Sequence, residues 1–275
     1  MSFLLCLNAS TIRPTPLVEK LHVAARAGFG GIELWHNEIE EYLQQGGTLA
    51  DLHERIQDLG LVVPSTINLK GWFDAKSDDD SAWELCRKRM SDAAILGVKY
   101  VVAGPPQSAS DWERGAENYG KLVRMGREIG VLPSMEFLGF VEQIHTIESA
   151  QRIVRESKES GGTIVLDPFH VYRGGGSFDS VRGLNPDEIS ICHFNDTRFE
   201  IPQTEQTDAD RVLPGEGELP LVEILRDLIR IGYRGALSLE LFSPELWQLD
   251  PEVVARDGLE RMQRMIADAR GASQR

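Results

Sequence analysis

The sequence predicts a single-domain α/β protein, a (β/α)₈ TIM barrel in which eight parallel strands close into a ring. Short apolar runs alternate with longer segments of helical periodicity, eight runs are present, and several helical segments end in glycine just before the next run. The main alternative, an open doubly wound sheet, usually has fewer strands and a glycine-rich turn after the first one. Here residues 9–16, Ala-Ser-Thr-Ile-Arg-Pro-Thr-Pro, follow the first run and contain no glycine. We therefore favour the barrel.

The predicted strands are rich in apolar and β-branched residues, as expected where helices cover both faces of a parallel sheet. They span 3–8, 31–35, 62–68, 100–104, 132–137, 163–167, 189–195 and 236–242. The clearest helical segments between and after them are 16–27, 80–96, 111–129, 146–160, 219–231 and 251–269. No linker-like composition divides the chain, so we expect one barrel domain over 1–270 and a mobile C-terminal tail over 271–275.

The net charge of the chain argues against a polyanionic partner. The 275 residues include 43 acidic and 29 basic side chains, a formal net charge of −14, which disfavours binding to nucleic acid or to an anionic membrane. No apolar run reaches the roughly 18 residues that a membrane-spanning helix needs, and the first residues do not resemble a secretory signal. We expect a cytoplasmic protein, and the sequence leaves open whether it forms a homo-oligomer.

Four consecutive predicted strands each carry one metal-type ligand near the carboxyl end: Glu136, Asp167, His193 and Glu240. In a closed barrel the faces that bear them converge on the axis at the catalytic rim. Three carboxylates gathered there would repel one another and lose hydration, and a divalent cation removes both costs. A single buried carboxylate is commonly a hydrogen-bonded core residue, but four groups at matching depth favour one Mn²⁺, Zn²⁺, Mg²⁺ or Co²⁺ ion.

Three further residues near this rim are candidates for substrate contacts. His170 follows Asp167 by three residues, Glu142 lies in the loop after the fifth strand, and Arg211 lies in the long irregular stretch 197–218. Such side chains suit the hydroxyl and carbonyl oxygens of a polyol or keto-sugar. Each also has a structural interpretation: a loop cap for His170, an exposed loop residue for Glu142 and a surface ion pair for Arg211.

Seven stretches are familiar: 8–11 (NAST), 96–102 (LGVKYVV), 136–139 (EFLG), 166–170 (LDPFH), 193–197 (HFNDT), 207–217 (TDADRVLPGEG) and 238–245 (SLELFSPE). With them the chain resembles, over nearly its whole length, the xylose isomerase-like TIM barrel superfamily of sugar phosphate isomerases and epimerases. Within that superfamily it looks most like the inosose (2-keto-myo-inositol) isomerases of inositol catabolism. Residues 140–143 and 171–176 depart from the pattern expected of the inosose group.

The resemblance implies that the four strand-end residues hold one divalent metal ion and that His170 and Arg211 contact the substrate. The implied reaction is isomerisation or epimerisation of a polyhydroxy ketone, most closely inosose, through a metal-stabilised enediolate. We expect Glu136 and Glu240 to be the catalytic pair, one removing the α-proton while the other, or a hydroxyl relay, returns it. A metal-assisted hydride shift is the competing route.

Other functions on the same barrel stay open. The chain is also compatible with a ketose 3-epimerase, a hydroxypyruvate isomerase-like enzyme or a dehydroshikimate dehydratase-like enzyme, which a substrate panel would distinguish. DNA-repair endonucleases that share this barrel type need several zinc ions, more histidines and a basic groove, whereas this chain has 6 histidines and a net charge of −14. A non-catalytic carbohydrate-binding barrel would show affinity without turnover.

Overall fold

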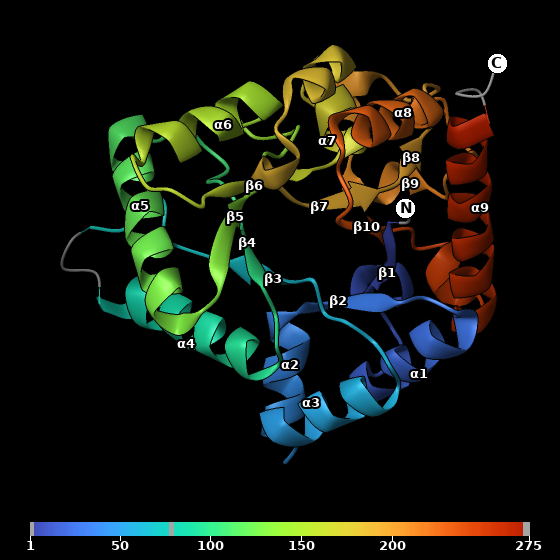
Figure 1. The fold of residues 1–275 in the computed structure, drawn as a ribbon, viewed down its shortest axis with the longest axis horizontal. Coiled ribbons are helices and arrows are strands. Elements are labelled where there is room, and N and C mark those ends of the chain that lie inside the picture. The colour runs from blue at the N-terminus through green and yellow to red at the C-terminus, as the bar shows by residue number, and fades with distance from the viewer. Residues whose placement is uncertain (1–2, 77–79, 272–275) are drawn as a thin grey trace.

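Eight parallel strands close into a barrel, which confirms the predicted fold class (Figure 1). The computed structural model describes residues 3–76 and 80–271. Around the barrel the strands follow the order β1–β10–β7–β6–β5–β4–β3–β2. Their bounds are β1 (Leu4–Asn8), β2 (Gly31–Trp35), β3 (Ser65–Leu69), β4 (Tyr100–Ala103), β5 (Leu132–Met135), β6 (Thr163–Leu166), β7 (Ile189–Phe194) and β10 (Ala236–Leu239). The third strand begins later than predicted because Val62 forms only an isolated bridge with Gly31.

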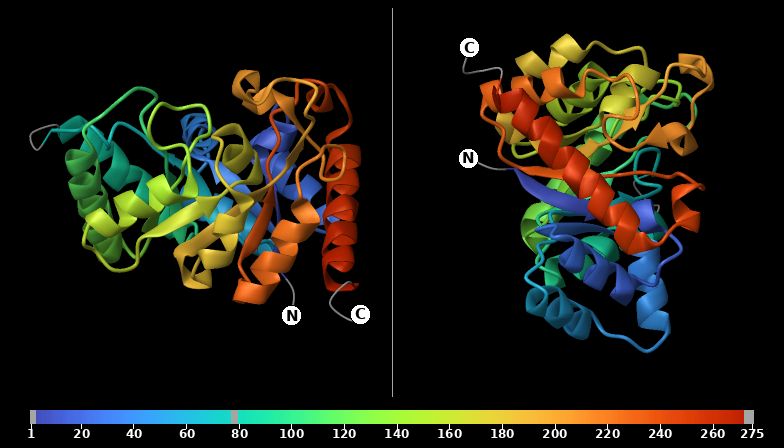
Figure 2. Two further views of the ribbon diagram at one scale, coloured as in Figure 1. Left: turned by 90° about the horizontal axis from the view of Figure 1, so that it is seen from above. Right: turned by 90° about the vertical axis from the view of Figure 1, so that its right-hand side faces the viewer.

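Helices surround the barrel on its outer side (Figures 1 and 2). They are α1 (Leu17–Ala27), α2 (His36–Gln44), α3 (Leu49–Asp58), α4 (Asp80–Ile95), α5 (Trp112–Ile129), α6 (Ile147–Glu156), α7 (Pro168–Arg173), α8 (Leu221–Ile231) and α9 (Pro251–Gly271). All six predicted helical segments are present, and α9 packs against both α8 and α1, which closes the outer ring. Among the described helices, none combines the length and the apolar composition that a membrane crossing requires.

Glycine residues end two of these helices, as predicted, and the last helix extends one residue into the predicted C-terminal tail. Gly28 and Gly130 follow α1 and α5 with φ of 99° and 93°, the left-handed conformation that ends a helix and that glycine adopts without strain. Of the predicted tail 271–275, Gly271 is the last residue of α9, and 272–275 lie outside the described residues.

The middle of the barrel is closed by a layer of small and branched side chains that we call the apolar plug. It consists of Cys6, Ile67, Val102, Val165, Ile191 and Ala236. Residues on the opposite face of the same strands, such as Leu166 and Cys192, join the large core between strands and helices. Because side chains alternate along a strand, the next inward-facing position lies two residues further on, at the carboxyl ends of the strands. That position is polar on several strands, and these side chains form the candidate site.

The long stretch after β7 is folded rather than irregular. It contains β8 (Asp196–Thr197) and β9 (Arg211–Val212), which pair antiparallel with each other. The Asp196 carboxylate is 1% exposed and accepts hydrogen bonds of 2.9–3.1 Å from the backbone N–H groups of Thr197, Gly215, Gly217 and Leu219. At Gly217 a Cβ atom would lie 2.3 Å from the Thr197 carbonyl oxygen, so only glycine fits this approach. One carboxylate thus ties the two ends of the segment together.

Candidate active site

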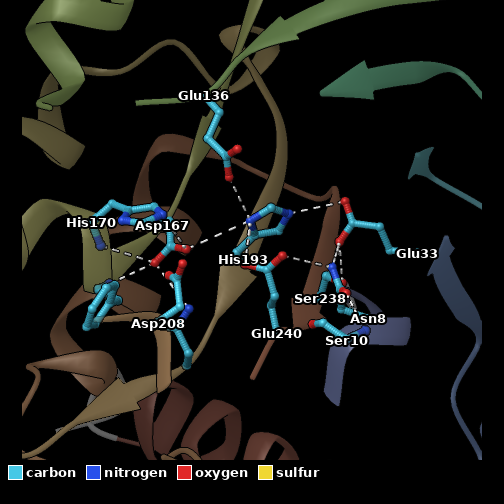
Figure 3. Close-up of polar contacts among 12 residues, drawn as sticks. Asn8, Ser10, Glu33, Glu136, Asp167, His170, His193, Asp208, Ser238 and Glu240 are labelled. Atoms are coloured by element: carbon cyan, nitrogen blue, oxygen red, sulfur yellow. Dashed lines mark hydrogen bonds and ion pairs between the residues drawn. The ribbon is translucent and has the colours of Figure 1, made fainter. Parts of the chain in front are cut away.

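The four predicted metal ligands meet at the carboxyl ends of their strands, around one nitrogen of His193. His193 lies on β7, and Glu136, Asp167 and Glu240 directly follow β5, β6 and β10. Nδ1 of His193 lies 3.1 Å from Glu240 Oε2, 3.3 Å from Glu136 Oε1 and 3.8 Å from Asp167 Oδ2 (Figure 3). All four residues are buried, Glu136 being the most exposed at 8%. The barrel therefore brings residues that are up to 104 positions apart in the chain, Glu136 and Glu240, close to the same buried atom.

This arrangement fits a divalent cation. Nδ1 of His193 is buried and makes no hydrogen bond, although carboxylates surround it. Burial opposes the charged form of the ring, but Glu240 and Glu33 outweigh that effect and raise the pKa of His193 well above its usual value. The surrounding charges therefore favour a positive charge at this point. Because carboxylate oxygens with one imidazole nitrogen are a donor set for zinc, manganese, cobalt or magnesium, the residues present suit the expected ion.

Glu33 on β2 is a further acidic member of the cluster, which the sequence analysis missed. Its Oε1 lies 3.1 Å from Nε2 of His193 and accepts a hydrogen bond of 2.5 Å from the Ser65 hydroxyl. Its Oε2 accepts hydrogen bonds from the Asn8 amide at 2.6 Å and the Ser238 hydroxyl at 2.8 Å. Burial works against ionisation, but His193 and the two hydroxyls outweigh it and lower the pKa of Glu33. In Figure 3 the His193 ring separates Glu33 from Asp167.

Arg211 is a buried cation inside the cluster. The alternative that Arg211 forms an ion pair at the protein surface is therefore wrong. Its Nη1 donates to Asp167 Oδ2 at 2.8 Å and to Glu240 Oε2 at 2.9 Å. Its Nη2 and Nε donate to Asp208 Oδ1 at 2.6 and 3.1 Å, and its Cζ lies 4.7 Å from the centre of the Phe169 ring. Burial alone would raise the pKa of Asp167, but Arg211 outweighs it and lowers that pKa to about 2.

His170 on α7 lies beside Arg211, as expected for a residue of the same site. Its Nδ1 accepts a hydrogen bond of 3.2 Å from the Gly139 N–H, and its Nε2 lies 3.0 Å from Nη2 of Arg211. Burial lowers the pKa of His170 to about 4, so the ring is neutral near pH 7. A neutral imidazole has only one unprotonated nitrogen. The ring can therefore accept a hydrogen bond from only one of the two donors that face it.

An open pocket of about 320 Å³ lies next to the cluster, and Glu136 forms part of its wall. The other walls come from the end of β3 and from the segments that follow β3, β4 and β5, and they include Asn68, Lys70, Phe73, Gln107 and Leu138. Burial raises the pKa of Glu136 to about 7. The volume is in the range of small-molecule sites. The cluster thus presents a carboxyl group to a space that can hold a substrate.

Glu142 lies apart from this cluster. It is exposed, and its Oε2 accepts a hydrogen bond of 2.9 Å from the backbone N–H of Ala109. The neighbouring Gln143 side chain accepts a hydrogen bond of 2.9 Å from the N–H of Ser110. Both contacts hold the segment after β4, whose first residues line the pocket. In this structure Glu142 therefore supports the pocket wall from outside, whereas His170 and Arg211 belong to the cluster itself.

Comparisons with known proteins agree with this barrel fold. Residues 21–265 match the family model described as a xylose isomerase-like TIM barrel. The inosose isomerase of Bacillus velezensis is 30% identical over 280 residues, which cover 96% of this chain and 97% of that protein. The inosose isomerase of Halalkalibacterium halodurans is 31% identical over 260 residues, which cover 90% and 91%.

A solved structure extends the likeness to three dimensions. The crystal structure of the IolI protein with a bound zinc atom has a TM-score of 0.88 and 27% sequence identity to this chain. The match covers 96% of this chain and 98% of that one. Together with the family model, which spans most of the sequence, these findings give a plain conclusion: the chain belongs to the family of xylose isomerase-like TIM barrels.

Proposed function

We propose that this protein is a metal-dependent isomerase of a polyhydroxy ketone and that its substrate is an inosose of inositol catabolism. The observation that carries the proposal is the unpaired Nδ1 of His193, enclosed by three carboxylates beside an open pocket. Isomerisation of a hydroxy ketone needs stabilisation of charge on oxygen and a group that moves a proton at carbon. The cluster offers a position for a cation and carboxylates for the proton. The two relatives named inosose isomerase support the choice of substrate.

Glu136, Asp167, His193 and Glu240 would hold the ion. A divalent ion bound there supplies Lewis-acid stabilisation of the negative charge that develops on the substrate oxygens. The donor set accommodates Zn²⁺, Mn²⁺, Mg²⁺ and Co²⁺, and the zinc atom bound in the related crystal structure supports a divalent ion in this protein as well.

We assign the proton transfer to Glu136 and Glu240. Glu136 lines the pocket, so its carboxylate faces the space in which a substrate would bind and is placed to take up and return a proton. In the view of Figure 3, Glu136 approaches Nδ1 of His193 from above and Glu240 approaches the same atom from below. The pair can therefore approach a bound ketone from two directions, one carboxylate removing the α-proton and the other returning it.

Arg211 and His170 are assigned to substrate binding. The Arg211 guanidinium carries a permanent positive charge and is fixed by Asp208 and the Phe169 ring. It suits the carbonyl and hydroxyl oxygens of the substrate. When Nδ1 of His170 accepts from the Gly139 N–H, the ring proton is on Nε2 and faces Nη2 of Arg211, which cannot accept it. A substrate hydroxyl near Nε2 would provide the missing hydrogen-bond acceptor. We also propose a cytoplasmic location, which the three buried, unpaired cysteines support.

The test is a substrate panel with the protein reconstituted separately with each of the four ions. We expect metal-dependent conversion of one inosose into another and, in D₂O, entry of deuterium at the carbon beside the carbonyl. Ketohexoses, hydroxypyruvate and 3-dehydroshikimate serve as the competing substrates. Turnover of one of these in place of inosose contradicts the substrate assignment. Conversion without deuterium over many turnovers contradicts the glutamate pair and favours a hydride shift, and no turnover with any ion contradicts the isomerase itself.

A further inference from the structure

We infer that Glu33 is a positioning residue of the metal site, which fixes the His193 ring so that Nδ1, and not Nε2, is offered to the ion. The inference rests on the metal site of the proposed function. It concerns a residue on β2, outside the four strands whose ends supply the proposed ligands. Glu33 and His193 are separated by 160 residues in the sequence, so only the closed barrel brings them together.

The hydrogen bond between the two side chains determines which nitrogen carries the proton. Nε2 of His193 lies 3.1 Å from Oε1 of Glu33, and both residues are 0% exposed, so bulk water does not compete. An ionised carboxylate only accepts hydrogen bonds, and Nε2 must therefore be the N–H donor. The lone pair of the neutral ring is then on Nδ1, the atom that faces Glu136 and Glu240. A carboxylate behind a ligating histidine also makes the imidazole a stronger donor to a metal.

Glu33 itself is a poor candidate for a metal ligand, although its position would allow it. Among the described residues, ligand atoms of Glu33, His193 and Glu240 lie within 4.8 Å of one another. Both oxygens of Glu33, however, already accept two hydrogen bonds each: Oε1 from Ser65 and His193, and Oε2 from Asn8 and Ser238. Movement of Glu33 toward an ion would leave these buried donors unpaired, which is costly. The hydrogen bonds therefore hold Glu33 behind the histidine.

Asn8 extends this support to a second ligand. Its amide nitrogen donates to Glu33 Oε2 at 2.6 Å and to Glu240 Oε1 at 3.1 Å. Its amide oxygen accepts from the Trp35 ring N–H and from the backbone N–H of Ser10, both at 2.9 Å. The amide is thus held from both ends and cannot turn over without losing these contacts. Glu33 and Glu240 are linked through it, so that two of the groups around the ion share one rigid support.

The first experiment compares Glu33→Gln with Asp227→Asn. Glu33→Gln keeps the size of the side chain and removes its charge, and we expect the zinc Kd, measured by competition with a chelator, to rise about 10–100-fold. Asp227→Asn is the matched control, because it also neutralises a buried carboxylate, but one on the outer helix α8 that bonds to Arg182 and Arg230 and contacts no described residue of the cluster around His193. We expect that variant to lower the Tm and to leave the zinc Kd unchanged.

The second experiment observes the proton directly and does not depend on the stability of a variant. In the zinc-loaded wild-type protein with ¹⁵N-labelled histidine, NMR should show the His193 ring proton on Nε2 and the metal on Nδ1. A proton on Nδ1 overturns the inference. So does an unchanged zinc Kd in folded Glu33→Gln, or the loss of one oxygen ligand in its X-ray absorption spectrum, which would make Glu33 a ligand. Failure of the wild-type protein to bind any of the four ions would instead contradict the proposed function.

Discussion

The apolar plug and the polar layer above it are built by the same strands, two residues apart. On β6 the inward position changes from Val165 to Asp167, and on β7 it changes from Ile191 to His193, and all four side chains are 0% exposed. The plug is stabilised by packing, whereas the polar layer depends on ion pairs, and Nδ1 of His193 makes no hydrogen bond within it. Burial alone does not distinguish the two layers. The two layers differ in that the polar layer contains buried polar atoms that need hydrogen-bond partners, and one of these atoms, Nδ1 of His193, has none.

Asp196 shows that a buried carboxylate at this rim does not by itself indicate a site. Its two oxygens accept four backbone hydrogen bonds, so its charge is fully accommodated by the chain. Among the residues that the structure describes, one buried arginine, Arg211, contacts the carboxylates around His193, at Asp167 and Glu240. The carboxylates around His193 therefore outnumber the arginine that contacts them.

The largest effect is expected where a carboxylate of the polar layer is neutralised. Glu240→Gln should lower kcat at saturating metal at least about 100-fold, because the proposed proton-transfer pair is lost. The matched control is Glu245→Gln, an exposed residue of the following loop, which should leave kcat unchanged. Near-normal turnover by Glu240→Gln at full metal occupancy would show that the role assigned to this residue is wrong.

Removal of the ion should destabilise the fold by an intermediate amount. With free ion at 100 times its Kd, the metal-bound protein should gain about 2.7 kcal/mol in free energy of unfolding over the chelated protein, provided that the unfolded chain does not bind the ion. Chemical denaturation with and without a chelator measures the difference. Coinciding denaturation curves would contradict a metal bound among these carboxylates.

The smallest effect is expected in the apolar plug. Ile191→Val removes one methylene from a fully buried side chain and should lower the free energy of unfolding by about 0.5–1.5 kcal/mol. The zinc Kd should stay at its wild-type value, because the change leaves the charges and hydrogen bonds of the polar layer in place. A large change in zinc Kd with unchanged stability would mean that the two layers are not separate.

The fold and the four proposed ligands were accessible to sequence analysis because both depend on local patterns. Alternation along each strand predicts which residues face the barrel axis, and His193 and Asp167 follow that pattern. Glu33 follows it too, since it stands between Ile32 and Leu34 on an apolar strand. It was missed because the search considered only the four consecutive strands with similar ends. A search for a single charged residue in every apolar strand would have found it.

Contacts made by loops could not be predicted in the same way. Arg211 reaches Asp167 because Asp196 fastens the surrounding segment, and no periodic pattern encodes that fastening. Glu142 bonds to the N–H of Ala109, 33 residues earlier in the chain. Such contacts depend on how two loops of particular length meet in space. Sequence analysis therefore identified Arg211 and Glu142 as residues near the rim, but not which of them enters the cluster.

The hydrogen bonds of Asp196 have a kinetic consequence for the segment that carries Arg211. Because both ends of that segment are tied to one carboxylate, its conformational entropy is lost when the protein folds and not when a ligand arrives. The guanidinium is preorganised, and capture of a ligand requires no slow ordering of this segment.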